Sequence, residues 1–185
     1  MTDLHAPPSG LPRPVDDGAA DHLPGRRLPR LSLASTAGGT IDLAAIPGRI
    51  VVYCYPMTGR PDVALPDGWD TIPGARGCTP QSCSWRDHYA ELKALGAEVF
   101  GLSTQSSDYQ REMVERLHLP FAVLSDAGGD FRRALELPTF EAAGMTLLKR
   151  LTFIARDGVI EAVLYPVFPS DADVAWVAGK LGAKA

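Results

Sequence analysis

Two cysteines five residues apart, Cys78 and Cys83, have the residue type and spacing for chemistry at sulfur. Cys78 directly follows Gly77, at the point where an amphipathic helix is predicted to begin, and Cys83 lies further along that helix. A thiol in the first turn of a helix lies near backbone N–H groups that have no partner in the helix. Their partial positive charge favours the thiolate, which is the nucleophilic form. Because a second thiol nearby can close a disulfide once the first is oxidised, this segment predicts redox chemistry.

Helical geometry keeps the two thiols apart while the helix is intact. Five residues of α-helix rise about 7.5 Å and turn about 140°, which places the two Cα atoms roughly 8–9 Å apart. A disulfide needs Cα atoms within about 7 Å of each other. Closing the bond must therefore unwind the first turn or two. Pro80 removes one backbone donor from the first turn, which makes unwinding less costly.

The third cysteine, Cys54, lies in the continuous apolar run at residues 50–55 that Pro56 closes. Such a run is typical of a strand that is buried on both faces, so Cys54 is interpreted as a core residue. His88 follows the cysteine pair, but a Cys-x4-Cys-x4-His spacing is not a usual zinc pattern. We therefore predict neither a metal site nor a cofactor.

The chain beyond residue 31 alternates strand and helix signals. Strands are predicted at residues 40–46, 50–55, 98–104, 121–125, 147–155 and 159–167, and helices at 78–95, 107–119, 130–137 and 171–181. The turn Arg156-Asp157-Gly158 is expected to join the last two strands as a hairpin. This order predicts an α/β fold with a central mixed β-sheet flanked by helices on both faces, as in thioredoxin-like proteins.

Composition divides the chain into an arm and one domain. Residues 1–30 hold six of the sixteen prolines and few aromatic or β-branched residues. Such a segment buries too little apolar surface to offset its ordering entropy. We predict that residues 1–30 form an extended, partly disordered arm and that residues 31–185 form one domain.

Charge and hydropathy exclude several classes of partner. A net charge of −4, with no basic run, argues against a nucleic-acid surface. No apolar stretch approaches the roughly 20 residues that a membrane span needs. The N-terminus has no apolar signal-peptide segment, and three cysteines do not make a disulfide framework. We expect a cytoplasmic protein.

Several motifs, found in order between residues 28 and 180, together resemble a known family. They are the run Gly77-Cys78-Thr79-Pro80-Gln81-Ser82-Cys83-Ser84-Trp85-Arg86-Asp87, then Leu119-Pro120-Phe121 with Leu124-Ser125-Asp126, and then Arg150-Leu151-Thr152-Phe153-Ile154 with Asp157-Gly158. The chain resembles a peroxiredoxin, closest to the Q subfamily, whose members are similar to the bacterioferritin comigratory protein.

The resemblance implies a thioredoxin fold and a thiol peroxidase that reduces hydrogen peroxide or organic hydroperoxides. It implies that Cys78 is the peroxidatic cysteine, that Cys83 resolves it through an intramolecular disulfide, and that Arg150 lies beside the reactive sulfur. It also implies a thioredoxin-like or small-thiol reductant, and it leaves open whether the protein is a monomer or a homodimer. The residues expected to bind the substrate are Arg76, Gly77, Thr79 and Trp85.

The expected reaction sets requirements of its own. A thiolate breaks a peroxide O–O bond by in-line attack, so the site needs donors for the oxygen on which charge accumulates. Arginine suits this task because it stays charged and offers a fixed fork of donors. Peroxiredoxins usually carry a threonine three residues before the peroxidatic cysteine, where this chain has Ala75. Thr71, Thr79 or Arg76 could supply that contact. The preceding loop is also longer than usual, with an extra segment at residues 60–69.

Two other function classes remain open on the sequence alone. A thiol–disulfide oxidoreductase acting on a protein or a dedicated small molecule shares this fold, but it usually carries Cys-x-x-Cys, which is absent here. The other class is a non-catalytic scaffold with a thioredoxin fold. Such a scaffold would not need two thiols at the start of a helix.

Overall fold

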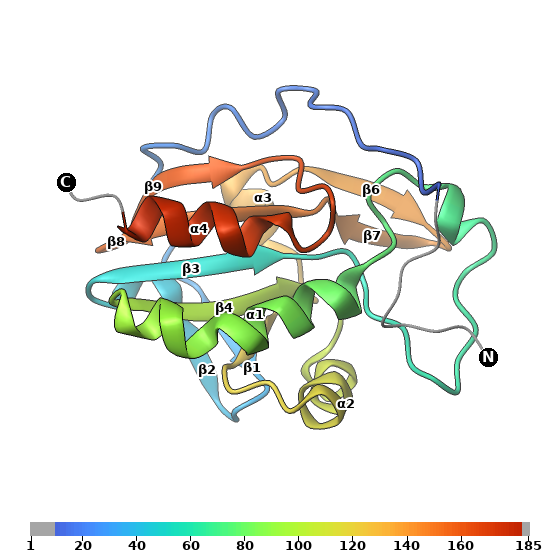
Figure 1. The fold of residues 1–185 in the computed structure, drawn as a ribbon, viewed down its shortest axis with the longest axis horizontal. Coiled ribbons are helices and arrows are strands. Elements are labelled where there is room, and N and C mark those ends of the chain that lie inside the picture. Colours follow the sequence, from blue (N-terminus) through green and yellow to red (C-terminus); the bar gives the residue numbers. More distant parts are fainter. Residues whose placement is uncertain (1–9, 183–185) are drawn as a thin grey trace.

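The computed structural model describes residues 10–182, and its centre is a seven-stranded mixed sheet (Figure 1). The strand order is β2-β1-β5-β4-β3-β8-β9. The strands of this sheet are β1 (Ser32–Ser35), β2 (Thr40–Asp42), β3 (Arg49–Cys54), β4 (Ala97–Ser103), β5 (Val123–Ser125), β8 (Leu151–Arg156) and β9 (Val159–Leu164). A separate hairpin pairs β6 (Thr139–Ala142) with β7 (Met145–Leu148). The helices are α1 (Cys78–Ala94), α2 (Ser107–Leu117), α3 (Asp130–Leu135) and α4 (Ala172–Gly182).

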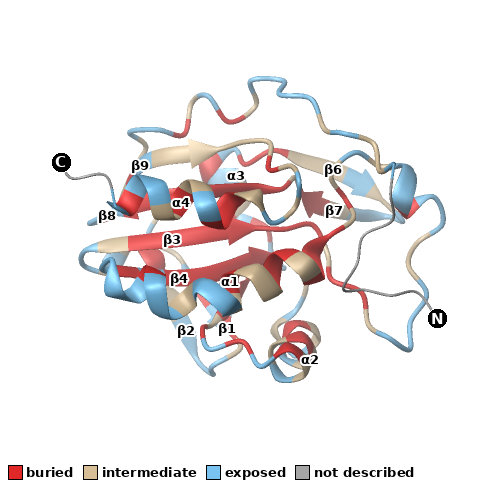
Figure 2. Ribbon diagram, in the orientation of Figure 1, coloured by how far each residue is buried: buried red, intermediate tan, exposed pale blue. Residues whose placement is uncertain are grey.

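Strands β3, β4 and β5 run parallel to one another in the middle of the sheet, and β8 and β9 extend it in antiparallel fashion beyond β3. The apolar residues of β3 after Arg49 are all buried, as expected for a strand covered on both faces (Figure 2). The carboxyl ends of the parallel strands meet at one edge, and the loop after β3 leads there into α1. In open α/β sheets that edge is where sites form.

Helices cover both faces of the sheet, which confirms the predicted fold class. In Figure 1, α1 and α4 lie side by side in front of the sheet. The buried side chains of α1, α2 and α4 belong to one hydrophobic cluster, together with one set of strand residues. The other face carries α3, whose Phe131 and Leu135 pack into a second cluster with Ile50 and Val52 of β3. The alternation of strand side chains between two faces explains this division.

The N-terminal segment differs from the prediction of an arm that lies outside the domain. Ala20, Leu23 and Leu28 are buried in the second cluster, and a bridge pairs Arg27 with Val159. In Figure 1 the segment runs along β9. Residues 20–28, which the sequence analysis assigned to the arm, therefore pack against the sheet. The arm was predicted to be partly disordered over residues 1–30, and its first nine residues lie outside the described residues.

The strand predicted at residues 147–155 is also corrected. It divides into β7 and β8, which belong to different sheets, and Lys149 and Arg150 form the break. Strands β1 and β6 are present although the sequence did not predict them. The other predicted strands and the predicted helices are present, with ends shifted by a few residues. None of the helices in residues 10–182 is both long and apolar enough to cross a membrane.

Candidate active site

The start of α1 is fixed by Gly77, whose φ of +107° lies in a region that only glycine adopts without strain. A Cβ atom at this position would lie 2.5 Å from Ser170 Oγ, so no side chain fits. Cys78 is the first residue of the helix. The backbone N–H groups of Cys78 and Thr79 come before the first bond of the helix, in which the N–H of Gln81 donates to the Gly77 carbonyl. Cys78 therefore belongs to the first turn of α1, where backbone N–H groups have no partner within the helix.

Arg150 comes from the break between β7 and β8, and its guanidinium reaches the sulfur. Its Nη2 lies 3.2 Å from Cys78 Sγ. The same nitrogen donates to the carbonyl oxygens of Gly74, Ala75 and Arg76, at 3.3, 3.3 and 3.2 Å. Arg150 is 3% exposed, so this charge acts in a poorly hydrated environment. One side chain thus shapes the loop before α1 and places a permanent cation beside the thiol.

A network of buried polar side chains holds the guanidinium of Arg150 in place. Its Nη1 donates to Gln81 Oε1, and Gln81 Nε2 donates to Asp173 Oδ2 at 2.6 Å. The same carboxylate oxygen accepts from Trp85 Nε1 at 3.1 Å and from Thr152 Oγ1 at 2.7 Å. Burial raises the pKa of Asp173, while these three donors and Arg150 oppose the shift. Elements α1, α4 and β8 are thereby tied together under the reactive residue.

The approach to Cys78 is narrow. Cys78 is 3% exposed and lines a pocket of about 20 Å³. The residues that line the pocket are Met57, Gly59, Leu65, Trp69, Arg76, Gly77, Cys78 and Thr79. A cavity needs about 10–15 Å³ to hold one water molecule. The pocket therefore admits a group of one or two heavy atoms.

Comparison with known proteins gives the family. The family model described as Redoxin matches residues 23–180. Peroxiredoxin Q of Gentiana triflora is 30% identical over 167 residues, which cover 86% of this chain and 69% of the relative. The chain belongs to the peroxiredoxin family. Peroxiredoxin Q of Sedum lineare is 33% identical over 137 residues, or 73% of this chain, and the match covers 64% of that protein, less than two thirds of its length.

Solved structures of peroxiredoxins share the fold. Peroxidoxin BcpB of Mycobacterium tuberculosis superposes with a TM-score of 0.72 at 24% identity, over 89% of this chain and 99% of that one. The bacterioferritin comigratory protein of Xanthomonas campestris gives a TM-score of 0.64 at 21% identity, over 82% and 92% of the two chains. These matches agree with the thioredoxin-like architecture that was expected from the sequence of this peroxiredoxin.

The residues predicted to bind substrate do not all meet at the sulfur of this peroxiredoxin. Gly77, Thr79 and Arg76 line the narrow pocket. The guanidinium of Arg76 pairs with Asp70, its Nη1 lying 3.0 Å from Oδ1. Trp85 lies elsewhere: it is fully buried, and its ring stacks on Tyr53 with centroids 5.3 Å apart. The prediction that Trp85 binds substrate is corrected, because seven residues of helix carry its side chain two turns into the core.

The structure also bears on which residue could replace the threonine that peroxiredoxins usually carry at the position of Ala75. Ala75 is buried, and its carbonyl accepts from Arg150 and from Cys78 Sγ, the latter at 3.6 Å. Thr71 Oγ1 donates instead to the Gly68 carbonyl at 2.6 Å. Of the three residues that could take over this role, Thr79 and Arg76 line the pocket, and Thr79 is the one of these two that carries a hydroxyl.

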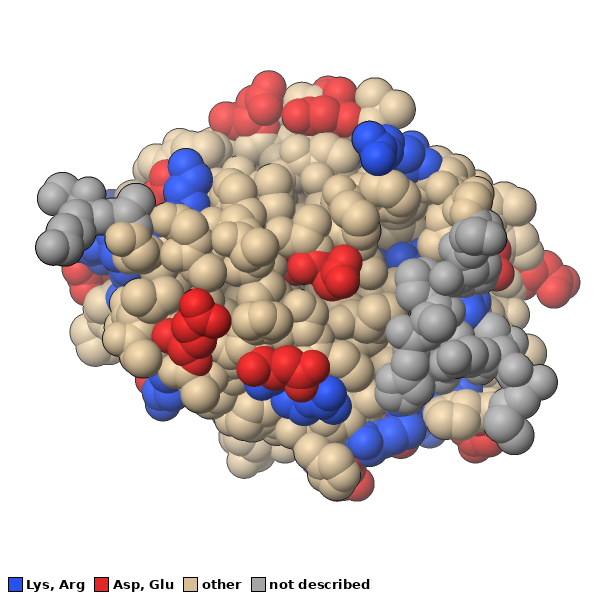
Figure 3. All heavy atoms as spheres, viewed as in Figure 1, with Lys and Arg blue, Asp and Glu red and all other residues tan. Residues whose placement is uncertain are grey.

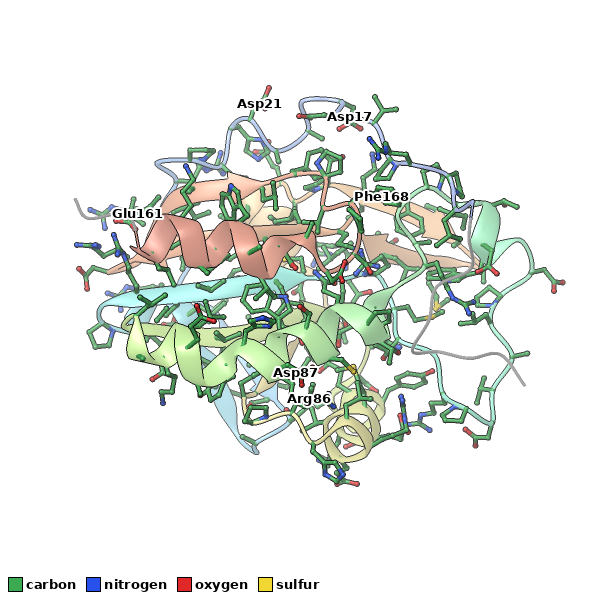
Figure 4. The ribbon with its side chains drawn as sticks, in the orientation of Figure 1. Asp17, Asp21, Arg86, Asp87, Glu161 and Phe168 are labelled. Carbon is green, nitrogen blue, oxygen red and sulfur yellow. The ribbon has the colours of Figure 1, made fainter. Side chains whose placement is uncertain are left out.

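The other two cysteines occupy different environments. Cys54 is fully buried in β3, and burial raises the pKa of its thiol. Cys83 is half-buried on α1, where burial raises the pKa of its thiol and Arg86 opposes that shift. Arg86 and Asp87 are paired beside it on α1 (Figure 4). All three cysteines are free, and α1 is intact around Cys78 and Cys83.

Sequence reasoning missed the residues that support the arginine. Gln81 had a usable signal, because it lies three residues after Cys78 and therefore on the same face of the helix. Asp173 had none, since only the packing of α4 against α1 brings its carboxylate to Gln81. Among the described residues, no group of histidines, cysteines or carboxylates has a geometry that could hold a metal ion.

Proposed function

We propose that this chain is a thiol peroxidase in which Cys78 attacks peroxide. The observation that carries the proposal is the arginine nitrogen 3.2 Å from a thiol that opens a helix and lines a pocket of one or two heavy atoms. A hydroperoxyl group has two heavy atoms. Cations and unpaired N–H groups at this position stabilise both the attacking thiolate and the oxygen that leaves.

The proposed reaction has two steps at sulfur. The Cys78 thiolate attacks the distal peroxide oxygen, so that an S–O bond forms, the O–O bond breaks and the alkoxide or hydroxide leaves and takes up a proton. The product is a sulfenic acid. The Cys83 thiolate then attacks this sulfur, which forms the disulfide and releases hydroxide, protonated to water. Two thiols of a reductant return both cysteines to the reduced state.

The burial of Cys78 favours peroxide over a protein disulfide as the oxidant. In thiol–disulfide exchange the attacking sulfur must line up with a disulfide carried on another chain, which requires access. Cys78 is 3% exposed at the bottom of a pocket of about 20 Å³, and that pocket is too small for a disulfide with its two attached Cβ atoms. The alternative of a protein disulfide oxidoreductase is therefore the less favoured one.

A stopped-flow thiol assay tests the proposal. Reduced protein carries three free cysteines. We expect one equivalent of hydrogen peroxide to consume two of these thiols and to leave Cys54 reduced, with a fluorescence change from Trp85 as the start of α1 moves. No loss of thiols over minutes with excess peroxide would reject the thiol peroxidase.

We propose further that Cys83 resolves the sulfenic acid by local unwinding of α1. Several side-chain bonds hold this segment. Gln81 is bonded to Arg150 and to Asp173, Ser82 Oγ to Tyr53 Oη at 3.2 Å and to Met113 Sδ at 3.8 Å, and Cys78 Sγ to Arg150. Trp85 is fully buried and bonded to Asp173, and it anchors the helix beyond that point. Unwinding should therefore end before Trp85, which keeps its cost low.

Oxidised protein is expected to contain a disulfide between Cys78 and Cys83 within one chain, since unwinding up to Trp85 brings the two sulfurs within bonding distance. Peptide mass spectrometry should find the crosslinked peptide. Amide exchange should become faster at residues 79–84 than in reduced protein and stay slow after Trp85. A disulfide between two chains, or a lasting sulfenic acid beside a reduced Cys83, would assign resolution to another thiol.

The reductant proposed for the disulfide is a thioredoxin-like protein or a small thiol, in the cytoplasm. Three free thiols, one fully buried, suit a reducing compartment. Acidic and basic side chains are interspersed on the face of the protein shown in Figure 3, and that face carries no broad basic patch. A nucleic-acid partner is therefore not proposed.

A further inference from the structure

A cavity of about 340 Å³ lies between the N-terminal segment, the loop before α1, strand β6 and the loop after β9. Its volume is within the range of about 300–1,000 Å³ typical of small-molecule sites. The cavity shares no lining residue with the narrow Cys78 pocket. It is therefore a separate space from the one proposed for peroxide.

Apolar side chains form most of the cavity wall. They are Pro14 and Val15 of the N-terminal segment, Ile72 and Pro73 of the loop before α1, Phe140 of β6, and Pro166 after β9. Three of these six residues are prolines, whose fixed φ angle limits the motion of the wall. Such a wall suits an apolar body, because that body leaves water when it binds.

The charged side chains of the wall carry more positive than negative charge. Arg13, Lys149 and Arg150 supply cations, and Asp17 supplies a carboxylate. Arg150 bonds to the loop before α1 and to Cys78 Sγ, so its charge already serves the candidate active site. The Arg13 guanidinium lies over the ring of Phe168, with its central carbon 5.2 Å from the ring centroid; Figure 4 labels Phe168 and Asp17. The excess of positive charge favours an anionic ligand.

One edge of the cavity already holds a carboxylate. Lys149 Nζ lies 2.7 Å from Asp17 Oδ2, and Tyr165 Oη donates to Asp17 Oδ1 at 2.8 Å. The bond from Lys149, followed by the bond from Tyr165, lowers the pKa of Asp17 to about 2, so this carboxylate is ionised at neutral pH. Lys149 and Tyr165 thus present one donor to each oxygen of a carboxylate. Because Asp17 is exposed, the carboxylate of a ligand can replace it.

We propose that this cavity binds a small organic carboxylate with an apolar body, whose carboxylate takes the place of Asp17 on Lys149 and Tyr165. The apolar wall encloses the rest of the ligand. The proposal does not depend on the thiol peroxidase function, since the two sites share no lining residue. An uncharged analogue loses the charge-assisted bond from Lys149. The ligand competes with Asp17, so removal of that side chain's charge should strengthen binding.

Isothermal titration calorimetry of the full chain with hydrocinnamate and with its uncharged amide, hydrocinnamamide, tests the site. Hydrocinnamate should bind the wild-type protein at least about tenfold more tightly than the amide. Lys149→Met should weaken the binding of hydrocinnamate about tenfold and leave that of the amide unchanged. Asp17→Asn should instead strengthen the binding of hydrocinnamate several-fold, because the competing carboxylate is gone.

The opposite signs distinguish recognition of a carboxylate from support of the N-terminal segment. Both variants break the same ion pair, so a pair that only holds the segment would make both weaken binding, and that result would overturn the proposal. Lys180→Met is the matched control, because Lys180 lies beside Trp176 on α4 and does not line the cavity. Its affinity for hydrocinnamate should equal that of the wild-type protein, and a loss as large as in Lys149→Met would contradict the site. Equal affinities for the two ligands, or no binding of hydrocinnamate at about 1 mM, would also overturn it.

Discussion

Cys78→Ser is expected to lose peroxide consumption by on the order of 10³-fold or more, which corresponds to a barrier increase of about 4 kcal/mol. The reason is chemical, because a serine hydroxyl stays protonated at neutral pH and an alkoxide is not available to attack the O–O bond. The substitution removes little volume at the start of α1, so the fold should be retained. The measurement is the rate of hydrogen peroxide loss under single-turnover conditions.

Cys54→Ser and Cys83→Ser are the matched controls. Cys54 is fully buried in β3, and burial raises the pKa of its thiol, so its replacement should leave peroxide consumption largely intact. Cys83→Ser should still be oxidised once at Cys78 but should stop at the sulfenic acid, which a dimedone probe detects. Loss of turnover in folded Cys54→Ser alone would move the reactive role to β3 and overturn the assignment.

The apolar and glycine patterns of the sequence were sufficient to predict the centre of the fold. The continuous apolar run of β3 and the start of α1 after Gly77 both lie where they were expected. These are local signals: a strand buried on both faces must be apolar throughout, and a left-handed residue before a helix favours glycine. The position of Cys78 as the first residue of α1 could be predicted from the sequence because it depends only on where that helix begins.

The surroundings of that thiol could not be predicted in the same way. Residues 147–155 are apolar enough to be one strand, yet the burial of Arg150 at Cys78 divides them into β7 and β8. The bonds of Asp173 to Gln81 and Trp85 join residues about 90 positions apart. The spacing of apolar residues along the sequence does not indicate contacts between residues so far apart. The N-terminal segment was misjudged for a similar reason, since the surface that Leu23 and Leu28 cover exists only after the sheet has formed.

The network of polar side chains that holds Arg150 should also contribute to the stability of the folded protein. Asp173 accepts bonds from three buried donors. Its removal would leave those donors unsatisfied, at a cost of about 1–3 kcal/mol for each group. The bonds of Asp17 to Lys149 and Tyr165 are instead exposed, and they hold the N-terminal segment, where Figure 4 labels Asp17. Lys149 and Arg150 are adjacent in sequence but take up unrelated roles.

Arg150→Ala is expected to slow the oxidation of Cys78 by peroxide at least about tenfold, or about 1.4 kcal/mol in the barrier. The change removes the donor 3.2 Å from Cys78 Sγ, and with it the stabilisation of the thiolate and of the leaving oxygen. Arg150→Lys should recover only part of the rate, because an ammonium group keeps the charge but cannot reproduce the fork that holds three carbonyls and Gln81. Stopped-flow tryptophan fluorescence gives the rate constants.

Gln81→Ala provides the sharper test, since Gln81 is bonded to Arg150 and has no bond to Cys78 Sγ of its own. We expect it to slow oxidation by a smaller factor, and we expect the double variant with Arg150→Ala to be no slower than Arg150→Ala alone, because the two side chains form one unit. Gln110→Ala is the matched control: it removes another fully buried glutamine, bonded to Ser103 and Leu124 instead, and should lower stability without changing the rate. Effects of Gln81→Ala and Arg150→Ala that simply add would show that the glutamine supports the fold and not the arginine.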